Sequence, residues 1–106
     1  MAQSTADPAQ RELSFLVHEE GDDVAVAVRY TEPGTARGAY LRSGASFEIE
    51  ICAPIPLGHK VALRELSENE HVTEYGVPIG MARHSIAQGD HVHTHNLRSA
   101  RWQNSL

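Results

Sequence analysis

The apolar residues of this chain come in runs of only five to seven residues before a turn residue interrupts them. Three runs are rich in β-branched and aromatic residues, which pack well on a pleated sheet. They are LSFLVH at 13–18, VAVAVRY at 24–30 and SFEIEIC at 46–52. Glycine and proline interrupt residues 33–45, which predicts a hairpin or loop there. Because no window keeps a helical period beyond one or two turns, the chain is predicted to be all-β, with short irregular strands.

A pattern recurs three times in the second half: an apolar residue, Gly or Asn three positions later, and Val after three more. The copies are IPLGHKV at 55–61, LSENEHV at 66–72 and IAQGDHV at 86–92. Gly and Asn tolerate a positive φ better than other residues do. The pattern therefore predicts a left-handed turn residue at Gly58, Asn69 and Gly89, with a strand beginning near each Val. The irregular spacing excludes a solenoid and favours a small, clipped-together sheet.

Composition limits the class of protein. A chain of 106 residues is one domain's worth. Nine basic residues against 14 acidic ones give a net charge of -5, which argues against nucleic acid as a partner. No apolar stretch approaches the roughly 18 residues of a membrane span, and the N-terminus lacks the features of a signal peptide. The expectation is a cytoplasmic protein without a membrane partner.

Composition also divides the chain into three segments. Residues 1–12 are predicted to be a flexible leader, residues 13–98 the folded domain and residues 99–106 a C-terminal tail. The thin supply of large apolar residues and the exposed strand edges are compatible with a homo-oligomer of the isolated chain. The single cysteine, Cys52, lies in an apolar run and is expected to be a buried thiol.

Three of the seven histidines lie in the segment HVHTH. If this segment is a strand, His91, His93 and His95 project from one face, about 6–7 Å apart. Neutral imidazole is the commonest protein ligand of transition metals, so the spacing indicates a metal site. A solvated or interface stripe of histidines would have the same pattern.

Two further groups of polar residues could bind a ligand or transfer protons. At the GHK turn, His59 stands next to Lys60, the only lysine of the chain; such a pair can bind an anion or transfer protons, although a plain surface turn is the simpler interpretation. His18 precedes Asp22 and Asp23 across an expected tight turn. A carboxylate that accepts a hydrogen bond from one imidazole nitrogen orients the other ring nitrogen toward a substrate or metal.

Taken in order, these segments resemble the SAF module of the altronate and galactarate dehydratase family. They are HEEGDDVAVAV, IPLGHKVAL and VTEYGVPIGMARHSIAQGDHVHTHNL, within residues 13–98. The resemblance implies a β-clip fold and a lyase that eliminates water or sulfite from a hydroxy acid. In that family a much larger catalytic portion accompanies the module. Because the chain ends at Leu106, the resemblance implies a small subunit, inactive alone, whose partner is a separate large catalytic dehydratase subunit.

The resemblance also implies roles for particular residues. The catalytic candidates are His18, His59, Lys60 and His95. The candidates for binding a small sugar-acid substrate are Asp22, Lys60 and Asn96. The candidates for metal ligands are His93 and His95. A divalent metal, Fe²⁺ by resemblance, is implied for the assembled enzyme, held here or by the large subunit. One departure is Asp23, where altronate-type sequences often carry Asn.

Three functions follow from this pattern. A hydro-lyase acting on a sugar acid of the altronate type is the leading hypothesis, because dehydration beside a carboxylate needs a base and an acid or metal. The alpha subunit of (2R)-sulfolactate sulfo-lyase, in the same group, is the second, since its C-terminal tail resembles NLRSARW. A non-catalytic sugar-acid-binding or assembly module is the third, because a fold alone does not imply catalysis.

Overall fold

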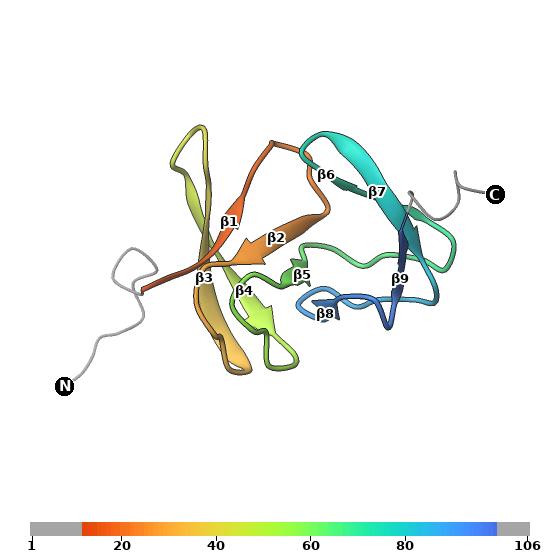
Figure 1. Cartoon of the computed structure of the whole chain (residues 1–106). Coiled ribbons are helices and arrows are strands. Elements are labelled where there is room, and N and C mark those ends of the chain that lie inside the picture. Colours follow the sequence, from red (N-terminus) through yellow and green to blue (C-terminus); the bar gives the residue numbers. More distant parts are fainter. Residues whose placement is uncertain (1–11, 100–106) are drawn as a thin grey trace.

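The computed structural model describes residues 12–99, and all regular structure in that range is strand (Figure 1). It contains nine strands and no helix, so the all-β prediction is confirmed for the described residues. Consistently, this part of the chain holds no helix long and apolar enough to cross a membrane. Apart from Glu12 and Ser99, the predicted leader and tail lie outside the described residues.

The larger sheet has six strands in the order β4-β3-β1-β2-β5-β8. These strands are β1 (Leu13–Val17), β2 (Val24–Ala27), β3 (Gly34–Tyr40), β4 (Ser46–Ile51), β5 (Lys60–Ala62) and β8 (His91–Val92). The three runs predicted from β-branched and aromatic residues are β1, β2 and β4. The glycine-rich stretch between β2 and β4 supplies β3, which forms an antiparallel hairpin with β4 and pairs in parallel with β1.

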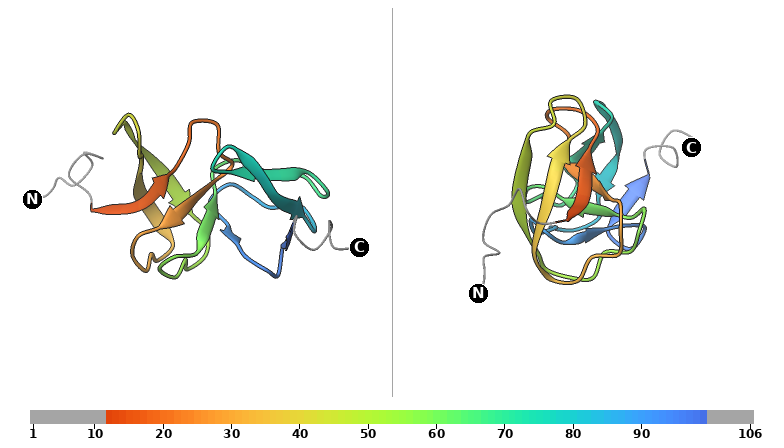
Figure 2. Two further views of the ribbon diagram at one scale, coloured as in Figure 1. Left: turned by 45° about the horizontal axis from the view of Figure 1, so that its top comes forward. Right: turned by 90° about the vertical axis from the view of Figure 1, so that its left-hand side faces the viewer.

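The smaller sheet has three antiparallel strands in the order β6-β7-β9. They are β6 (His71–Glu74), β7 (Val77–Ala82) and β9 (Leu97–Ser99). This sheet and the β3–β4 hairpin lie on opposite sides of the folded domain, with β5 and β8 between them (Figures 1 and 2). The short strands β5 and β8 are therefore where the two halves of the fold meet.

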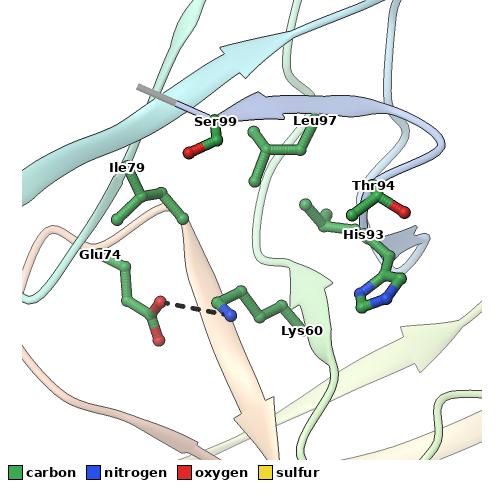
Figure 3. Close-up of a pocket in the computed structure, with 8 residues that line it drawn as sticks. Lys60, Glu74, Ile79, His93, Thr94, Leu97 and Ser99 are labelled. Atoms are coloured by element: carbon green, nitrogen blue, oxygen red, sulfur yellow. Dashed lines mark ion pairs between the residues drawn. The ribbon is translucent and has the colours of Figure 1, made fainter. Parts of the chain in front are cut away.

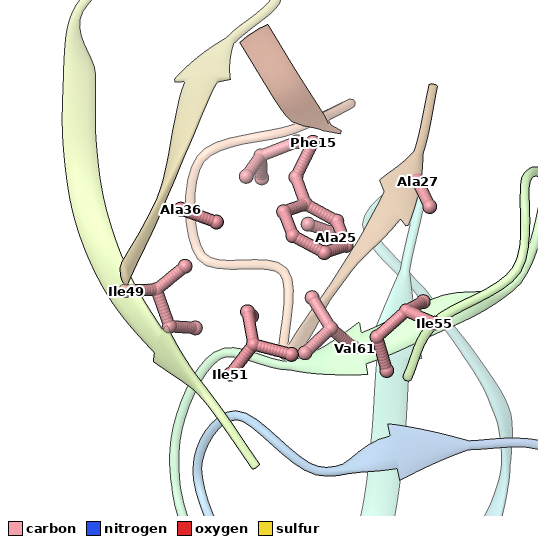
Figure 4. Close-up of a cluster of buried hydrophobic side chains, with 9 residues drawn as sticks. Phe15, Ala25, Ala27, Ala36, Ile49, Ile51, Ile55 and Val61 are labelled. Atoms are coloured by element: carbon pink, nitrogen blue, oxygen red, sulfur yellow. The ribbon is translucent and has the colours of Figure 1, made fainter. Parts of the chain in front are cut away.

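Each half has its own hydrophobic core, and β2 and β5 contribute to both. Ala25 and Val61 point into the core of the larger sheet with Phe15 (Figure 4). Their neighbours Val24 and Ala62 point the opposite way, into a second core beside the smaller sheet. Successive strand side chains face opposite sides, so a strand between two cores must be apolar on both faces. This explains why VAVA is a continuous apolar run.

The threefold repeat is confirmed as a structural unit. Gly58, Asn69 and Gly89 have φ values of 68–86°. The apolar residue that opens each copy and the Val that closes it are at most 1% exposed. They are Ile55, Leu66 and Ile86, followed by Val61, Val72 and Val92. Each copy thus anchors a loop in a core, reverses through a left-handed residue and begins a strand.

The expectation of a buried Cys52 thiol is wrong, because Cys52 is exposed. The alternation of β4 turns Ile49 and Ile51 inward, and the next residue therefore points outward. Its Sγ lies 3.4 Å from the Gln88 carbonyl oxygen, and its backbone N–H donates to the carbonyl of Gly89 at 2.9 Å. The end of β4 is in this way attached to the third repeat.

Candidate functional site

The sheet register brings two distant histidine-containing segments together. Strands β5 and β8 pair antiparallel with Lys60 opposite Val92, so His59, just before β5, faces His93, just after β8. The rings of these two histidines stack with their centroids 4.3 Å apart. The GHK turn and the HVHTH segment therefore form one imidazole cluster.

Three imidazoles of this cluster are close enough to share a ligand. His59 Nδ1 lies 2.9 Å from His91 Nε2, and one ring nitrogen from each of His59, His91 and His93 lies within 4.8 Å of the others. The pKa of both His91 and His93 is lowered below the ordinary 6.5. The larger cause is the partial loss of hydration of the rings, and the second is repulsion by the charge of the nearby His59. The lowered pKa favours the neutral form of both rings, which is the form that binds a metal.

The condition that HVHTH is one continuous strand is not met, because β8 ends at Val92 and the chain then turns. Asn96 closes this turn. Its Oδ1 accepts a hydrogen bond from the His93 N–H at 2.9 Å, and its Nδ2 donates to the His91 carbonyl at 2.7 Å. Asn96 is 2% exposed. A buried amide needs partners, and the turn supplies them, whereas a straight strand would point the backbone groups elsewhere.

His95 lies at the edge of the cluster. Its ring centroid is 5.4 Å from that of His91, tilted by 46°, and the side chain is exposed. The structure groups the ligand nitrogen of His93 with those of His59 and His91. The metal and catalytic roles predicted for His95 stay predictions.

A second grouping is centred on Glu74, a carboxylate of β6 that is 2% exposed. Its Oε2 lies 3.6 Å from His18 Nδ1 and its Oε1 lies 3.8 Å from Lys60 Nζ. The ring of Tyr75 packs on His18 with a centroid distance of 4.2 Å. Burial raises the pKa of Glu74 above the ordinary 4.5, against the opposing charges of Lys60 and His18. Such a carboxyl group is suited to exchange protons closer to neutral pH.

Glu74 and Lys60 line a cavity of about 280 Å³ between the two sheets (Figure 3). Its other lining residues are Ile79, Val92, His93, Thr94, Leu97 and Ser99. Figure 3 shows the Lys60 side chain extended toward the Glu74 carboxylate, with the His93 ring beside the strand that carries Lys60. Because His93 belongs to the imidazole cluster and also lines the cavity, the cavity links the buried carboxylate to that cluster. Its volume is near the lower end of ordinary ligand sites, which suits a small acid.

Asp22 and Asp23, in the turn between β1 and β2, hold the segments around Glu74 in place. The Asp22 carboxylate accepts hydrogen bonds from the backbone N–H groups of Tyr75 and Gly76, both at 3.0 Å. The Asp23 carboxylate accepts from Arg64 Nε at 2.8 Å. Asp22 also closes its own turn, accepting from the N–H of Glu19 at 3.2 Å. The bonds from Asp22 to Tyr75 and Gly76 tie the β1–β2 turn to the β6–β7 hairpin and so place His18 beside Glu74.

The described contacts of Asp22 and Asn96 go to the backbone, and the substrate-binding roles predicted for both stay predictions. Glu74 is not among the residues predicted from the sequence, although a signal exists. It follows Val72 by two positions on one strand, and both side chains are buried. A carboxylate at an inward-facing position is rare unless it is paired. His91 is likewise absent from the predicted metal ligands, although it shares their spacing.

We expect Glu74→Gln to raise the free energy of unfolding at neutral pH, because desolvation is the main cause of the raised pKa and glutamine cannot ionise. A raised folded-state pKa means that the folded state binds the proton more tightly than the unfolded chain. The wild-type protein therefore loses stability as pH rises from about 4.5 through the folded-state pKa. Urea unfolding at several pH values measures the difference.

The two proteins should differ least at the acid end, where Glu74 is protonated. A Glu74→Gln protein that is less stable than wild type at pH 8 would mean that the attraction to Lys60 and His18 outweighs desolvation. The same substitution at an exposed position, Glu50→Gln, is the control. Glu50 lies on β4, and its side chain accepts a hydrogen bond from the exposed Thr35 hydroxyl. This control should leave the pH profile unchanged.

Comparison with known proteins relates this geometry to one family. The altronate/galactarate dehydratase SAF domain matches residues 13–100. The (2R)-sulfolactate sulfo-lyase subunit alpha of Chromohalobacter salexigens is 40% identical over 92 residues, which cover 85% of this chain and 98% of that subunit. Altronate dehydratase of Bacillus subtilis is 37% identical over 86 residues, which cover 81% of this chain and 16% of that enzyme. The chain belongs to the altronate/galactarate dehydratase SAF domain family.

Proposed function

We propose that this chain is the small subunit of a lyase that eliminates a group from a hydroxy acid, together with a larger catalytic portion. The observation that carries the proposal is the cavity in which the Lys60 ammonium and the buried Glu74 carboxylate face the same space as His93. A carboxylate substrate needs a cation for recognition, and elimination needs groups that accept and supply protons. The cavity brings these chemical types together.

Lys60 is the residue that would bind the substrate carboxylate, because it is the only cation among the described lining residues. Glu74 would exchange a proton with the substrate. As the base, the Glu74 carboxylate would take the proton from the carbon beside the substrate carboxylate, and the electron pair of that C–H bond would form the double bond to the next carbon. The leaving group would depart from that next carbon with its bonding electrons, as sulfite or, with a proton added, as water. His18, about a quarter exposed, contacts Glu74 from outside the lining residues and can pass the proton to solvent.

Two buried atoms in this arrangement support a role beyond structure. His18 Nδ1 and Glu74 Oε2 lie 3.6 Å apart, beyond hydrogen-bond range, and neither atom has a hydrogen-bond partner among the described residues. A buried polar atom without a partner costs free energy. A carboxyl group that is buried at such a cost in free energy and lies next to a cavity is a candidate for a catalytic or binding residue.

A divalent metal is part of the proposal, and the residues fit one. His59, His91 and His93 present three imidazole nitrogens in a small space, and imidazole is a ligand type that Fe²⁺ and similar ions accept. When bound, such an ion would polarise an oxygen of the substrate as a Lewis acid. Lys60 and Glu74 would orient the acid and move its proton whichever group leaves.

Two branches of the reaction compete, and each has a supporting observation. Elimination of sulfite is favoured by the relative named as a sulfo-lyase alpha subunit, whose length the similarity covers to 98%. Elimination of water from a sugar acid is favoured by the altronate dehydratase of Bacillus subtilis at 37% identity. In either case we place the enzyme in the cytoplasm, with the larger catalytic portion as its partner.

The test is to co-express the chain with the large lyase subunit of the same organism, purify the complex without oxygen in the presence of Fe²⁺, and assay altronate and (2R)-sulfolactate in parallel. Elimination from either acid that requires this chain supports the proposal and identifies the branch. A stable complex that eliminates nothing from either acid contradicts it and favours a binding or assembly module. The large subunit alone is the control for activity that does not depend on this chain.

A further inference from the structure

We infer that His59, His91 and His93 form a site for one divalent transition-metal ion, with further coordination positions open to an oxygen of the substrate or of a partner. The use of the ion in elimination rests on the proposed function. Its binding, in contrast, is a property of this chain's own residues and is measurable without any partner.

The nitrogen positions match a coordination sphere. With metal–nitrogen distances of 2.0–2.1 Å, two ligands at angles of 90–109° lie about 2.8–3.4 Å apart. His59 Nδ1 and His91 Nε2 are 2.9 Å apart. The third nitrogen lies within 4.8 Å of both, and His93 is exposed, so a modest rotation of its ring brings the nitrogen into range.

The ligand set discriminates between metals. All three ligands are imidazole nitrogens, and no carboxylate or thiolate of the described residues joins the group. Nitrogen ligands suit Zn²⁺, Fe²⁺, Co²⁺, Ni²⁺ and Cu²⁺, whereas Mg²⁺ and Ca²⁺ prefer oxygen. Three protein ligands with an open position is also the arrangement of catalytic rather than structural zinc-type sites.

The site is supported from behind by Asn96. One side-chain amide accepts from the backbone of His93 and donates to the backbone of His91, so it sets the spacing of these two ligands. Asn96 is buried and does not itself reach the ligand group. It is a positioning residue for the metal, and it explains how a turn rather than a strand presents the two rings on one side.

The test is a titration of the full chain, without a histidine tag and stripped of metal by a chelator, with Co²⁺. The d–d absorption and titration calorimetry both report binding. We expect one equivalent of Co²⁺ to bind, and a large excess of Mg²⁺ not to compete. Removing a residue that only hydrogen-bonds a metal ligand weakens metal binding roughly 10–100-fold. Alanine at His59, His91 or His93 removes a ligand itself and should weaken Co²⁺ binding by more than that. Asn96→Ala should fall within that roughly 10–100-fold range.

His84→Ala is the matched control, because His84 is an exposed histidine outside the cluster; it should leave Co²⁺ binding unchanged. Circular dichroism confirms that each variant is folded. Co²⁺ binding that survives in the His59→Ala/His93→Ala double variant, or a folded wild-type chain that binds no Co²⁺ at millimolar concentration, would overturn the inference. A chain that binds Co²⁺ through these three residues but supports no elimination would leave the metal site standing and contradict the proposed function alone.

Discussion

Substitution of Lys60 by methionine is expected to lower kcat/KM of the assembled lyase by at least about 100-fold, or about 3 kcal/mol of transition-state stabilisation. Lys60 Nζ lies 3.8 Å from the Glu74 carboxylate and is the only cation among the described residues that line the cavity. Methionine keeps the length and the apolar stem but removes the charge. Steady-state kinetics on the hydroxy acid measure the loss, which we expect mainly in KM.

The control for Lys60 is Arg29→Met, which removes a half-exposed cation that pairs with the exposed Glu12 and does not line the cavity. It should keep wild-type kinetics. The double variant Lys60→Met/Glu74→Gln separates stability from function, because Lys60→Met leaves the Glu74 carboxylate with His18 alone. The double variant should regain thermal stability without regaining turnover. A Lys60→Met enzyme with more than half of the wild-type kcat/KM would exclude Lys60 from substrate binding.

We expect Gly89→Ala to lower the free energy of unfolding by at least about 4 kcal/mol, which is exceptional for one methyl group. Gly89 has a φ of +86°, and an added Cβ would lie 2.0 Å from the Glu50 carbonyl oxygen. The backbone cannot easily shift, because the Gly89 N–H donates to Ala62 and its carbonyl accepts from Cys52. Urea or thermal unfolding measures the loss, and a domain at the low end of the ordinary range, with a stability of about 5 kcal/mol, would be partly unfolded.

Gly58→Ala is the matched control, since Gly58 occupies the same position in the first repeat. Its φ is +83°, and nothing lies within 4 Å of an added Cβ. Only the cost of a left-handed alanine applies there, about 1–2 kcal/mol. Equal losses in the two variants would show that backbone conformation alone, and not the approach of Glu50, makes glycine necessary at position 89.

The repeat is the part of the fold that follows most directly from the sequence. Asn69 and the two glycines adopt positive φ because that preference belongs to the residue itself and hardly depends on distant contacts. The alternation of β4 could also have placed Cys52 correctly. The segment ends one residue after Ile51, so the alternation that turns Ile51 inward turns Cys52 outward, although an apolar environment in the sequence suggested burial.

The candidate site follows from the sequence only in part. The residue types were evident, since imidazoles, one lysine and the carboxylates supply the chemistry. Their grouping was not, because His59 and His91 are 32 residues apart and alternation along one strand contains no information about which strand lies beside it. Asn96 shows the same limit, because its burial turns the chain after Val92 and moves His95 to the edge of the cluster.

The sequence by itself determined the strand class, the turn positions and the family, because these depend on short-range backbone preferences and on motifs that are continuous in the chain. The tertiary structure decided which side chains act together. The pairing of β5 with β8 assembles the three imidazoles, and the packing of β6 against β2 places the buried Glu74 between His18 and Lys60. Distances between remote residues and the pKa of a buried carboxyl group arise from strand register and desolvation, and neither exists until the chain has folded.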